Sequence, residues 1–183
     1  GHGVTGACRT PAEVVALKRD LGHPIVQVCA GRHHSLARSS AGEVFVWGTI
    51  GTSAPCEPLP RRHEGFDGWV AQAGCGDAFC AALIPTGVVV WGGAIGAQPL
   101  LVCSEGGAHS LVCGATSVAC ISATGAALVS PPLSGDDQAA MRVPEPHEMH
   151  AVRAPCGEPF IRLGCGAAFT AALTVSGRVY VFT

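Results

Sequence analysis

Cysteine and histidine are the side chains of this sequence with the widest chemical scope, and their spacing indicates which chemistry to expect. The chain contains ten cysteines and eight histidines. No two cysteines have the close spacing usual for zinc ligands, and the nearest pair is Cys75 and Cys80. We therefore interpret most cysteines as small buried positions in a reducing compartment, with disulfides or a metal as the alternative.

Candidates for acid-base chemistry lie only in one long connection, Pro131 to Pro159. It carries the carboxylates Asp136 and Asp137 and the histidines His147 and His150. The chain has no G-x-S-x-G elbow, no phosphate loop ending in G-K-S/T and no H-E-x-x-H motif. We therefore expect no enzyme activity, and we assign no catalytic residue, cofactor or metal.

The first six residues, GHGVTG, formally satisfy the dinucleotide-binding pattern G-x-G-x-x-G. Such a loop must follow a strand and open a helix, whereas nothing precedes Gly1 here and Pro11 interrupts the next segment. We interpret the stretch as a glycine-rich loop.

An internal repeat organises the rest of the chain. Copies lie at Val26 to Gly48, Ala71 to Gly92, Val112 to Val129 and Ile161 to Phe182. Two glycines frame each copy, always eleven residues apart: Gly31 and Gly42, Gly76 and Gly87, Gly114 and Gly125, Gly166 and Gly177. The spacing between copies varies, which is typical of loops. The repeat therefore fixes the fold class.

Each copy is expected to form antiparallel strands. The apolar stretches HSLAR, FCAAL, VACI and FTAAL lie between the framing glycines, and runs rich in β-branched and aromatic residues follow the second glycine. A short turn joins them, with the second glycine supplying a positive φ. A third strand precedes the first glycine, and the variable connection must supply a fourth. Four antiparallel strands, repeated radially, predict an all-β propeller.

Composition sets the outer limits. Hydrophobic residues make up 48% of the 183 residues and charged residues 13%, which favours a folded, repeat-built β protein. The net charge of −2 and the scattered Arg and Lys disfavour direct nucleic-acid binding. No apolar run reaches the length of a membrane span. Since the chain does not begin with Met, we expect a processed or truncated product. From the cysteine positions we expect an intracellular, reducing compartment.

Val26 to Gly48 carries the pattern V-x-V-x-x-G-x-x-H-S-L-A followed by G-x-V-x-x-W-G. This pattern resembles the regulator of chromosome condensation repeat, and it includes His34, Gly42 and Trp47. The resemblance extends over the whole chain. It is strongest in the first copy, good in the second and fourth, and degraded in the third.

The copies differ at several of these positions. His34 is replaced by Phe79, Ser117 and Phe169 in the other copies. Residues that drift in this way indicate packing positions. We therefore expect His34 to be a core histidine hydrogen-bonded to backbone, and Trp47 and Trp91 to be packing aromatics at blade edges.

The resemblance implies propellers of about seven blades, so four repeats form an incomplete arc. We place the repeats at about residues 1–48, 49–93, 94–130 and 131–183, within a single region. The open arc leaves unpaired strand edges, so we expect the missing blades to come from the rest of a longer chain or from a partner.

Two connections are candidates for partner binding. One is Glu57 to Asp67, with a basic tip at Arg61, Arg62 and His63. Phe66 and the nearby Trp69 are the candidate aromatic anchors. The other is the acidic stretch with Asp136 and Asp137. An ordinary solvated loop is the alternative for both.

Two functions follow. The first is a non-catalytic scaffold that binds other protein subunits. The second is a regulator or guanine-nucleotide exchange factor for a small GTPase, because the family's founding member promotes exchange on a Ran-type GTPase. No loop here matches the exchange loops residue by residue, and fold alone does not transfer function, so we favour the scaffold.

Overall fold

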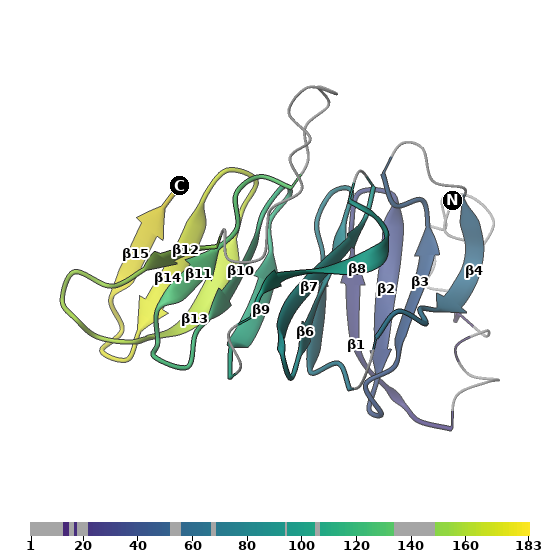
Figure 1. The fold of residues 1–183 in the computed structure, drawn as a ribbon, viewed down its shortest axis with the longest axis horizontal. Helices are drawn as coiled ribbons and strands as arrows, with labels where there is room; N and C mark the ends of the chain where they lie inside the picture. The colour runs from purple at the N-terminus through teal and green to yellow at the C-terminus, as the bar shows by residue number, and fades with distance from the viewer. Residues whose placement is uncertain are drawn as a thin grey trace.

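The computed structural model is built from β-strands joined by turns and loops. The described residues are 13–14, 17, 22–51, 56–66, 69–93, 95–104, 107–133 and 149–183. They form fifteen strands in four sheets, which stand side by side in chain order (Figure 1). No helix among these residues is long and apolar enough to cross a membrane. The glycine-rich stretch Gly1 to Gly6 lies outside the described residues.

The first two sheets each have four antiparallel strands, hydrogen-bonded in sequence order. The first sheet contains β1 (Ile25–Ala30), β2 (His34–Ser39), β3 (Val44–Gly48) and β4 (Glu57–Arg62). The second sheet contains β5 (Gln72–Cys75), β6 (Cys80–Ile84), β7 (Gly87–Gly92) and β8 (Gly96–Cys103).

The third and fourth sheets follow the same plan. The third sheet contains β9 (His109–Cys113), β10 (Val118–Ile121), β11 (Ala127–Val129) and β12 (His150–Val152). The fourth sheet contains β13 (Phe160–Cys165), β14 (Thr170–Thr174) and β15 (Val179–Phe182). The degraded third copy thus builds a complete sheet, and in three sheets the fourth strand comes from the variable connection, as predicted.

The framing glycines form the two turns that join the first three strands of each sheet. The N–H of every first glycine donates to the carbonyl oxygen three residues later, over 2.8–2.9 Å. Every second glycine has a positive φ, between 78° and 142°. A side chain is strained in this conformation, so glycine is needed at the second position, as predicted.

Three hydrophobic clusters lie between neighbouring sheets, and a fourth, with Ala37, Phe45 and Trp47, covers the other face of the first sheet. Between the first and second sheets, Leu36 and Val46 pack with Ala82 and Trp91. Phe79 and Val118 belong to the second cluster, and Phe160 to the third. In the second sheet, β7 is buried on both faces, as its continuous run GVVVWG predicts, and β6 is nearly so.

The fourth sheet has an outer face without a neighbouring sheet among the described residues. Along β15 exposed and half-buried residues alternate, and Val179 and Val181 are 66% and 65% exposed. This is the pattern of a blade at the open end of an arc, so the four sheets are an incomplete propeller, as the sequence predicts.

Candidate functional site

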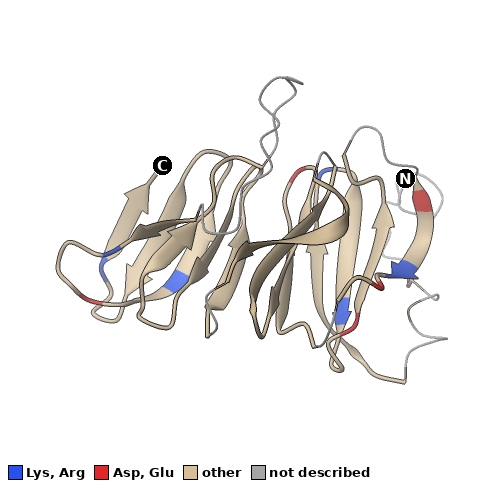
Figure 2. Cartoon of the chain, viewed as in Figure 1, with Lys and Arg blue, Asp and Glu red and all other residues tan. Residues whose placement is uncertain are grey.

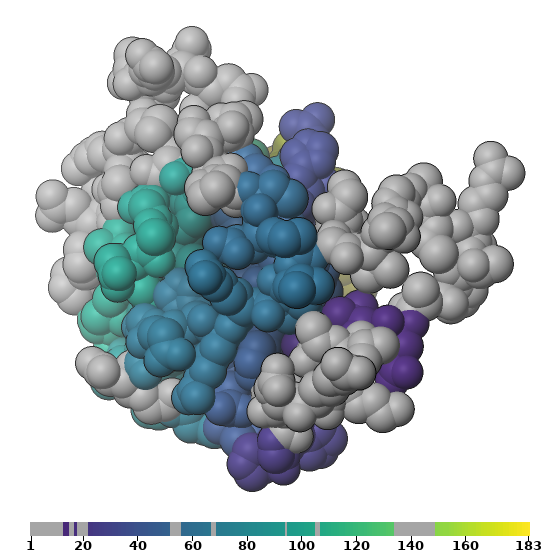
Figure 3. Space-filling model, turned by 90° about the vertical axis from the view of Figure 1, so that its right-hand side faces the viewer, coloured from purple at the N-terminus to yellow at the C-terminus, as the bar shows by residue number. Residues whose placement is uncertain are grey.

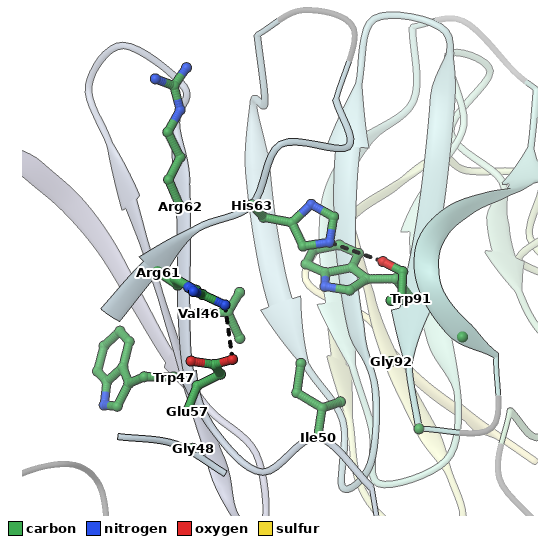
Figure 4. A pocket seen from close by; sticks show the side chains of 13 residues that line it. Val46, Trp47, Gly48, Ile50, Glu57, Arg61, Arg62, His63, Trp91 and Gly92 are labelled. Carbon is green, nitrogen blue, oxygen red and sulfur yellow. Dashed lines mark hydrogen bonds and ion pairs between the residues drawn. The ribbon is translucent and has the colours of Figure 1, made fainter. Parts of the chain in front are cut away.

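A hollow of about 340 Å³ opens between the first and second sheets, on the side that carries their outer strands. Its lining comes from β3 and β4 of the first sheet and from β7 and β8 of the second (Figure 4). Seen from the end of the first sheet, the segment containing β4 lies at the surface beside that containing β8 (Figure 3). The hollow therefore depends on how two blades are placed against each other.

The floor of the hollow is apolar because Val46, Ile50 and Trp91 meet there. Trp47 ends β3 and Trp91 ends β7, and they are 8% and 1% exposed. The side chain of Ile50 lies against Gly92, where a Cβ would have no room. Both tryptophans are packing aromatics, as predicted. Trp91 packs between the first two sheets, whereas Trp47 packs with Ala37 and Phe45 and its indole points away from Trp91 (Figure 4).

His63 closes one side of the hollow and connects the two outer strands. Its ring stacks on Phe66 and on Trp91, with centroids 5.0 Å apart in both pairs. The Gly65 N–H donates to Nδ1 (3.1 Å), so the ring proton is on Nε2, which donates to the Ala97 carbonyl (3.2 Å). Burial lowers the pKa of His63, and the Ala97 carbonyl and Glu64 oppose this effect. The neutral ring therefore ties the segment after β4 to β8.

Two arginines form the rim. Arg61 pairs with Glu57 at 3.1 Å, and Arg62 pairs with Glu43 at 3.2 Å. Both arginine side chains are exposed, and Figure 4 shows Arg61 beside Glu57 while Arg62 extends away from this pair. Exposed pairs of this kind contribute little to stability, so a partner can compete for them at small cost.

The other predicted partner-binding residues have different surroundings. Phe66 is half-buried and packs edge-on against Trp91, with centroids 5.1 Å apart, so it supports the hollow from within. Trp69 is 51% exposed, and its indole covers Gly42 outside the hollow. Asp136 and Asp137 lie outside the described residues. Charged side chains elsewhere in the described part of the chain are few and scattered (Figure 2).

A second group of functional side chains lies deep between the same two sheets. His34, Cys75 and Cys80 place one ring nitrogen and two Sγ atoms within 4.8 Å of one another. His34 is fully buried, as predicted, but neither ring nitrogen forms a hydrogen bond with a described residue, although we expected a backbone partner. Burial lowers its pKa, while the nearby Phe79 carbonyl and Asp77 act in the opposite direction.

The neighbouring thiols extend this cluster. Contact with Cys29 lowers the pKa of Cys75, but contact with Cys80 and burial outweigh that effect, so the net pKa is raised. The pKa of Cys29 is raised as well, chiefly by its contact with Cys75. These groups are therefore protonated thiols and poor nucleophiles. Sequence spacing gave no signal for the cluster, because its members come from three strands of two sheets.

Four antiparallel sheets in a row, with their cores between them, define the class of this molecule as an arc of β-propeller blades. Residues 25–49 match the family model of the Regulator of chromosome condensation (RCC1) repeat. The resemblance seen in the sequence is thus confirmed for the first copy of the repeat.

Solved structures show the same fold. Human WBSCR16 is 21% identical, with a TM-score of 0.69 over 90% of this chain and 48% of its own. Prp20p from Saccharomyces cerevisiae, which binds Gsp1p and histones, is 16% identical. It has a TM-score of 0.69, and the match covers 87% of this chain and 43% of Prp20p. The computationally designed Ika4 protein is 18% identical. It has a TM-score of 0.57, and the match covers 94% of this chain and 98% of Ika4. The chain spans less than half the length of the first two.

Proposed function

We propose that this chain is part of a non-catalytic protein-protein interaction scaffold, and that the hollow between the first two sheets receives a segment of a partner protein. The observation that carries this proposal is the lining of the hollow. An apolar floor with Val46, Ile50 and Trp91 lies beside a rim with Arg61 and Arg62. Tryptophan and arginine dominate binding energy at protein interfaces when they are anchored in such a pocket.

The partner segment that fits has an apolar side chain next to a carboxylate. The apolar group enters over Ile50 and Trp91, and the carboxylate competes with Glu57 for Arg61, which is held only by an exposed ion pair. The clamp formed by His63 keeps the hollow in shape before binding, which reduces the entropy cost of association.

The test is affinity capture with the full-length protein and two matched variants. Ala97→Phe fills the hollow from the exposed edge of β8, and Arg61→Glu reverses the charge at the rim. Arg162→Glu makes the same charge reversal on β13, far along the arc, and is the control. We expect both hollow variants to lose the partner and the control to keep it. Equal recovery by all four proteins contradicts the proposal.

Regulation of a small GTPase is the second candidate, and the likeness to Prp20p supports it, because that protein binds Gsp1p. Capture in the presence and absence of a chelator that strips Mg²⁺ and nucleotide distinguishes the two functions. A GTPase that is held more tightly without nucleotide favours an exchange factor. Partners that are indifferent to nucleotide favour the scaffold.

The rest of the ring is also a proposal. Because the chain covers 48% of WBSCR16 and 43% of Prp20p, we assign the missing blades to the remainder of a longer chain, with a partner as the alternative. The exposed valines of β15 would then be covered by the next blade. The mass of the native protein, measured against the 18.5 kDa of this chain, tests this assignment.

A further inference from the structure

The cluster between the first two sheets has the composition of a metal site. His34 comes from β2, while Cys75 and Cys80 face each other across β5 and β6 of the second sheet. Their ligand atoms all lie within 4.8 Å of one another. In a tetrahedral zinc site with these ligands, neighbouring donor atoms are about 3.5–3.8 Å apart, so small side-chain rotations bring the three into place.

The burial and hydrogen bonding of the His34 ring are a second, independent observation that favours a metal site. Its side chain is fully buried, and neither ring nitrogen meets the geometry of a hydrogen bond with a described residue, although the Phe79 carbonyl is close enough to raise the pKa of the ring. Buried polar groups are nearly always paired, because an unpaired one loses its hydration without compensation. A coordinated metal ion would give one of these nitrogens a partner.

The other interfaces of the arc lack this combination. The positions equivalent to His34, Cys75 and Cys80 hold Phe79, Cys113 and Val118 between the second and third sheets. They hold Ser117, Cys165 and Thr170 between the third and fourth sheets, where the Cys165 thiol lies 3.4 Å from the Thr170 hydroxyl. Only the first interface brings a histidine and two cysteines together among the residues described.

We propose that His34, Cys75 and Cys80 bind a thiophilic metal ion, with Zn²⁺ as the favoured ion, and that the metal joins the first blade to the second. Two thiolates and a neutral imidazole cancel the charge of Zn²⁺, which suits a buried site. The two thiol protons leave for solvent as the Zn–S bonds form. The Cys29 thiol contacts Cys75 from the first sheet, but it is not among the ligand atoms that all lie within 4.8 Å of one another.

The test measures metal bound to the purified full-length protein under reducing conditions. After dialysis against metal-free buffer, Zn²⁺ is added back and quantified by mass spectrometry. Co²⁺ is then titrated as a spectroscopic probe, because tetrahedral thiolate coordination gives intense visible absorption. We expect one equivalent of tightly bound metal, the Co²⁺–thiolate spectrum, and a higher melting temperature with Zn²⁺.

The repeat itself supplies matched variants. His34→Phe copies Phe79, Cys75→Ala copies Ala30, and Cys80→Thr copies Thr170, so each replacement is a residue that another blade already accommodates. We expect each variant to weaken Co²⁺ binding by more than the roughly 10–100-fold caused by loss of an outer-shell partner. Cys165→Ala changes the equivalent thiol of the fourth sheet and should bind as the unmodified protein does.

Circular dichroism of the metal-free proteins separates loss of the site from loss of the fold. A folded His34→Phe protein that no longer binds Co²⁺ supports the site. Three results would overturn it: no stoichiometric metal in the unmodified protein, unchanged binding in His34→Phe and Cys80→Thr, or a Cys75–Cys80 disulfide that persists under reduction.

Discussion

The side-chain amide of Gln27 pairs with both backbone groups of Ala73 on the neighbouring sheet. Its Nε2 donates to the Ala73 carbonyl (2.7 Å), and its Oε1 accepts the Ala73 N–H (3.1 Å). Arg38 donates to the same Oε1 (3.1 Å) and holds the amide in place. The glutamine thus acts as a peptide group that joins the inner strands of the first two blades.

The next copy repeats this contact in part. Gln72 also stands four residues before the first framing glycine, and its Oε1 accepts the N–H of Leu111 (2.7 Å) on the third sheet. The glutamine position therefore joins each of the first two blades to its successor.

Replacing Gln27 with Leu should destabilise the arc. The change leaves the Ala73 N–H without its side-chain partner and the Ala73 carbonyl with only the weak Cys29 thiol donor in a partly buried interface, which costs about 1–3 kcal/mol. Equilibrium unfolding in urea measures the loss. Gln72→Leu removes one such bond and should cost less. A larger loss for Gln72→Leu than for Gln27→Leu would show that the paired geometry is unimportant.

Trp69 should contribute to binding more than to folding. It is 51% exposed, and the Arg38 guanidinium lies 5.8 Å from its ring centroid. We expect Trp69→Ala to weaken partner capture, to cost about 0.5–1 kcal/mol from the lost cation–π contact, and to leave the β-sheet circular dichroism intact. The buried Trp91→Ala should cost about 3–5 kcal/mol. Loss of β structure in Trp69→Ala would instead place this residue in the core.

His63 should make the link between β4 and β8 sensitive to acid. Because burial lowers the folded pKa of His63, its contribution to stability is present above the unfolded pKa of about 6.5 and is lost as the pH falls toward the folded value. Protonation of Nδ1 also breaks the bond from the Gly65 N–H.

Denaturant unfolding from pH 7.5 to 5 measures this effect. The free energy of unfolding should change by less than about 1.4 kcal/mol per pH unit, which is the limit for the uptake of one proton, because His63 is half-exposed. His63→Phe keeps the stacking on Phe66 and Trp91 but cannot titrate, so its profile should be flatter. Equal profiles for the two proteins would exclude His63 as the source of the acid sensitivity.

Cys156 should be more reactive toward alkylating reagents than the buried thiols. The Tyr180 hydroxyl donates to its Sγ (3.3 Å), and this bond and the Glu158 backbone lower the pKa of the exposed Cys156. Burial raises the pKa of Cys165. Iodoacetamide labelling followed by peptide mass spectrometry should find Cys156 modified well before Cys165 at neutral pH. Tyr180→Phe should slow the labelling of Cys156 alone, and an unchanged rate in this variant would contradict the assigned cause.

Much of the fold could be predicted from local pattern. The apolar stretch after His34 forms β2, and the run after Gly87 forms β7, because alternation and β-branched residues report burial within a strand. The positive φ of Gly42 follows from its place in a tight turn. The sequence also indicated Arg61 and Arg62 as partner-binding candidates, and both lie at the rim of the hollow.

Other features could not be predicted in this way. The sequence indicated Phe66 as a candidate anchor for a partner but gave no sign that it packs on Trp91, where the segment after β4 meets the second sheet. His34 was expected to bond to backbone, yet its ring faces two thiols. Both outcomes depend on the offset between neighbouring sheets, and the spacing of residues within one copy does not encode that offset.

The amino-acid sequence by itself determined the repeat, the strands and the turns of this protein. These features arise from interactions among residues that are close along the chain, so they leave a periodic signal. The tertiary structure alone decided that Gln27 meets Ala73, that His34 meets Cys75 and Cys80, and that strands of two blades enclose a hollow. Each of these contacts joins two blades, and its geometry is set by the packing of apolar side chains between the sheets.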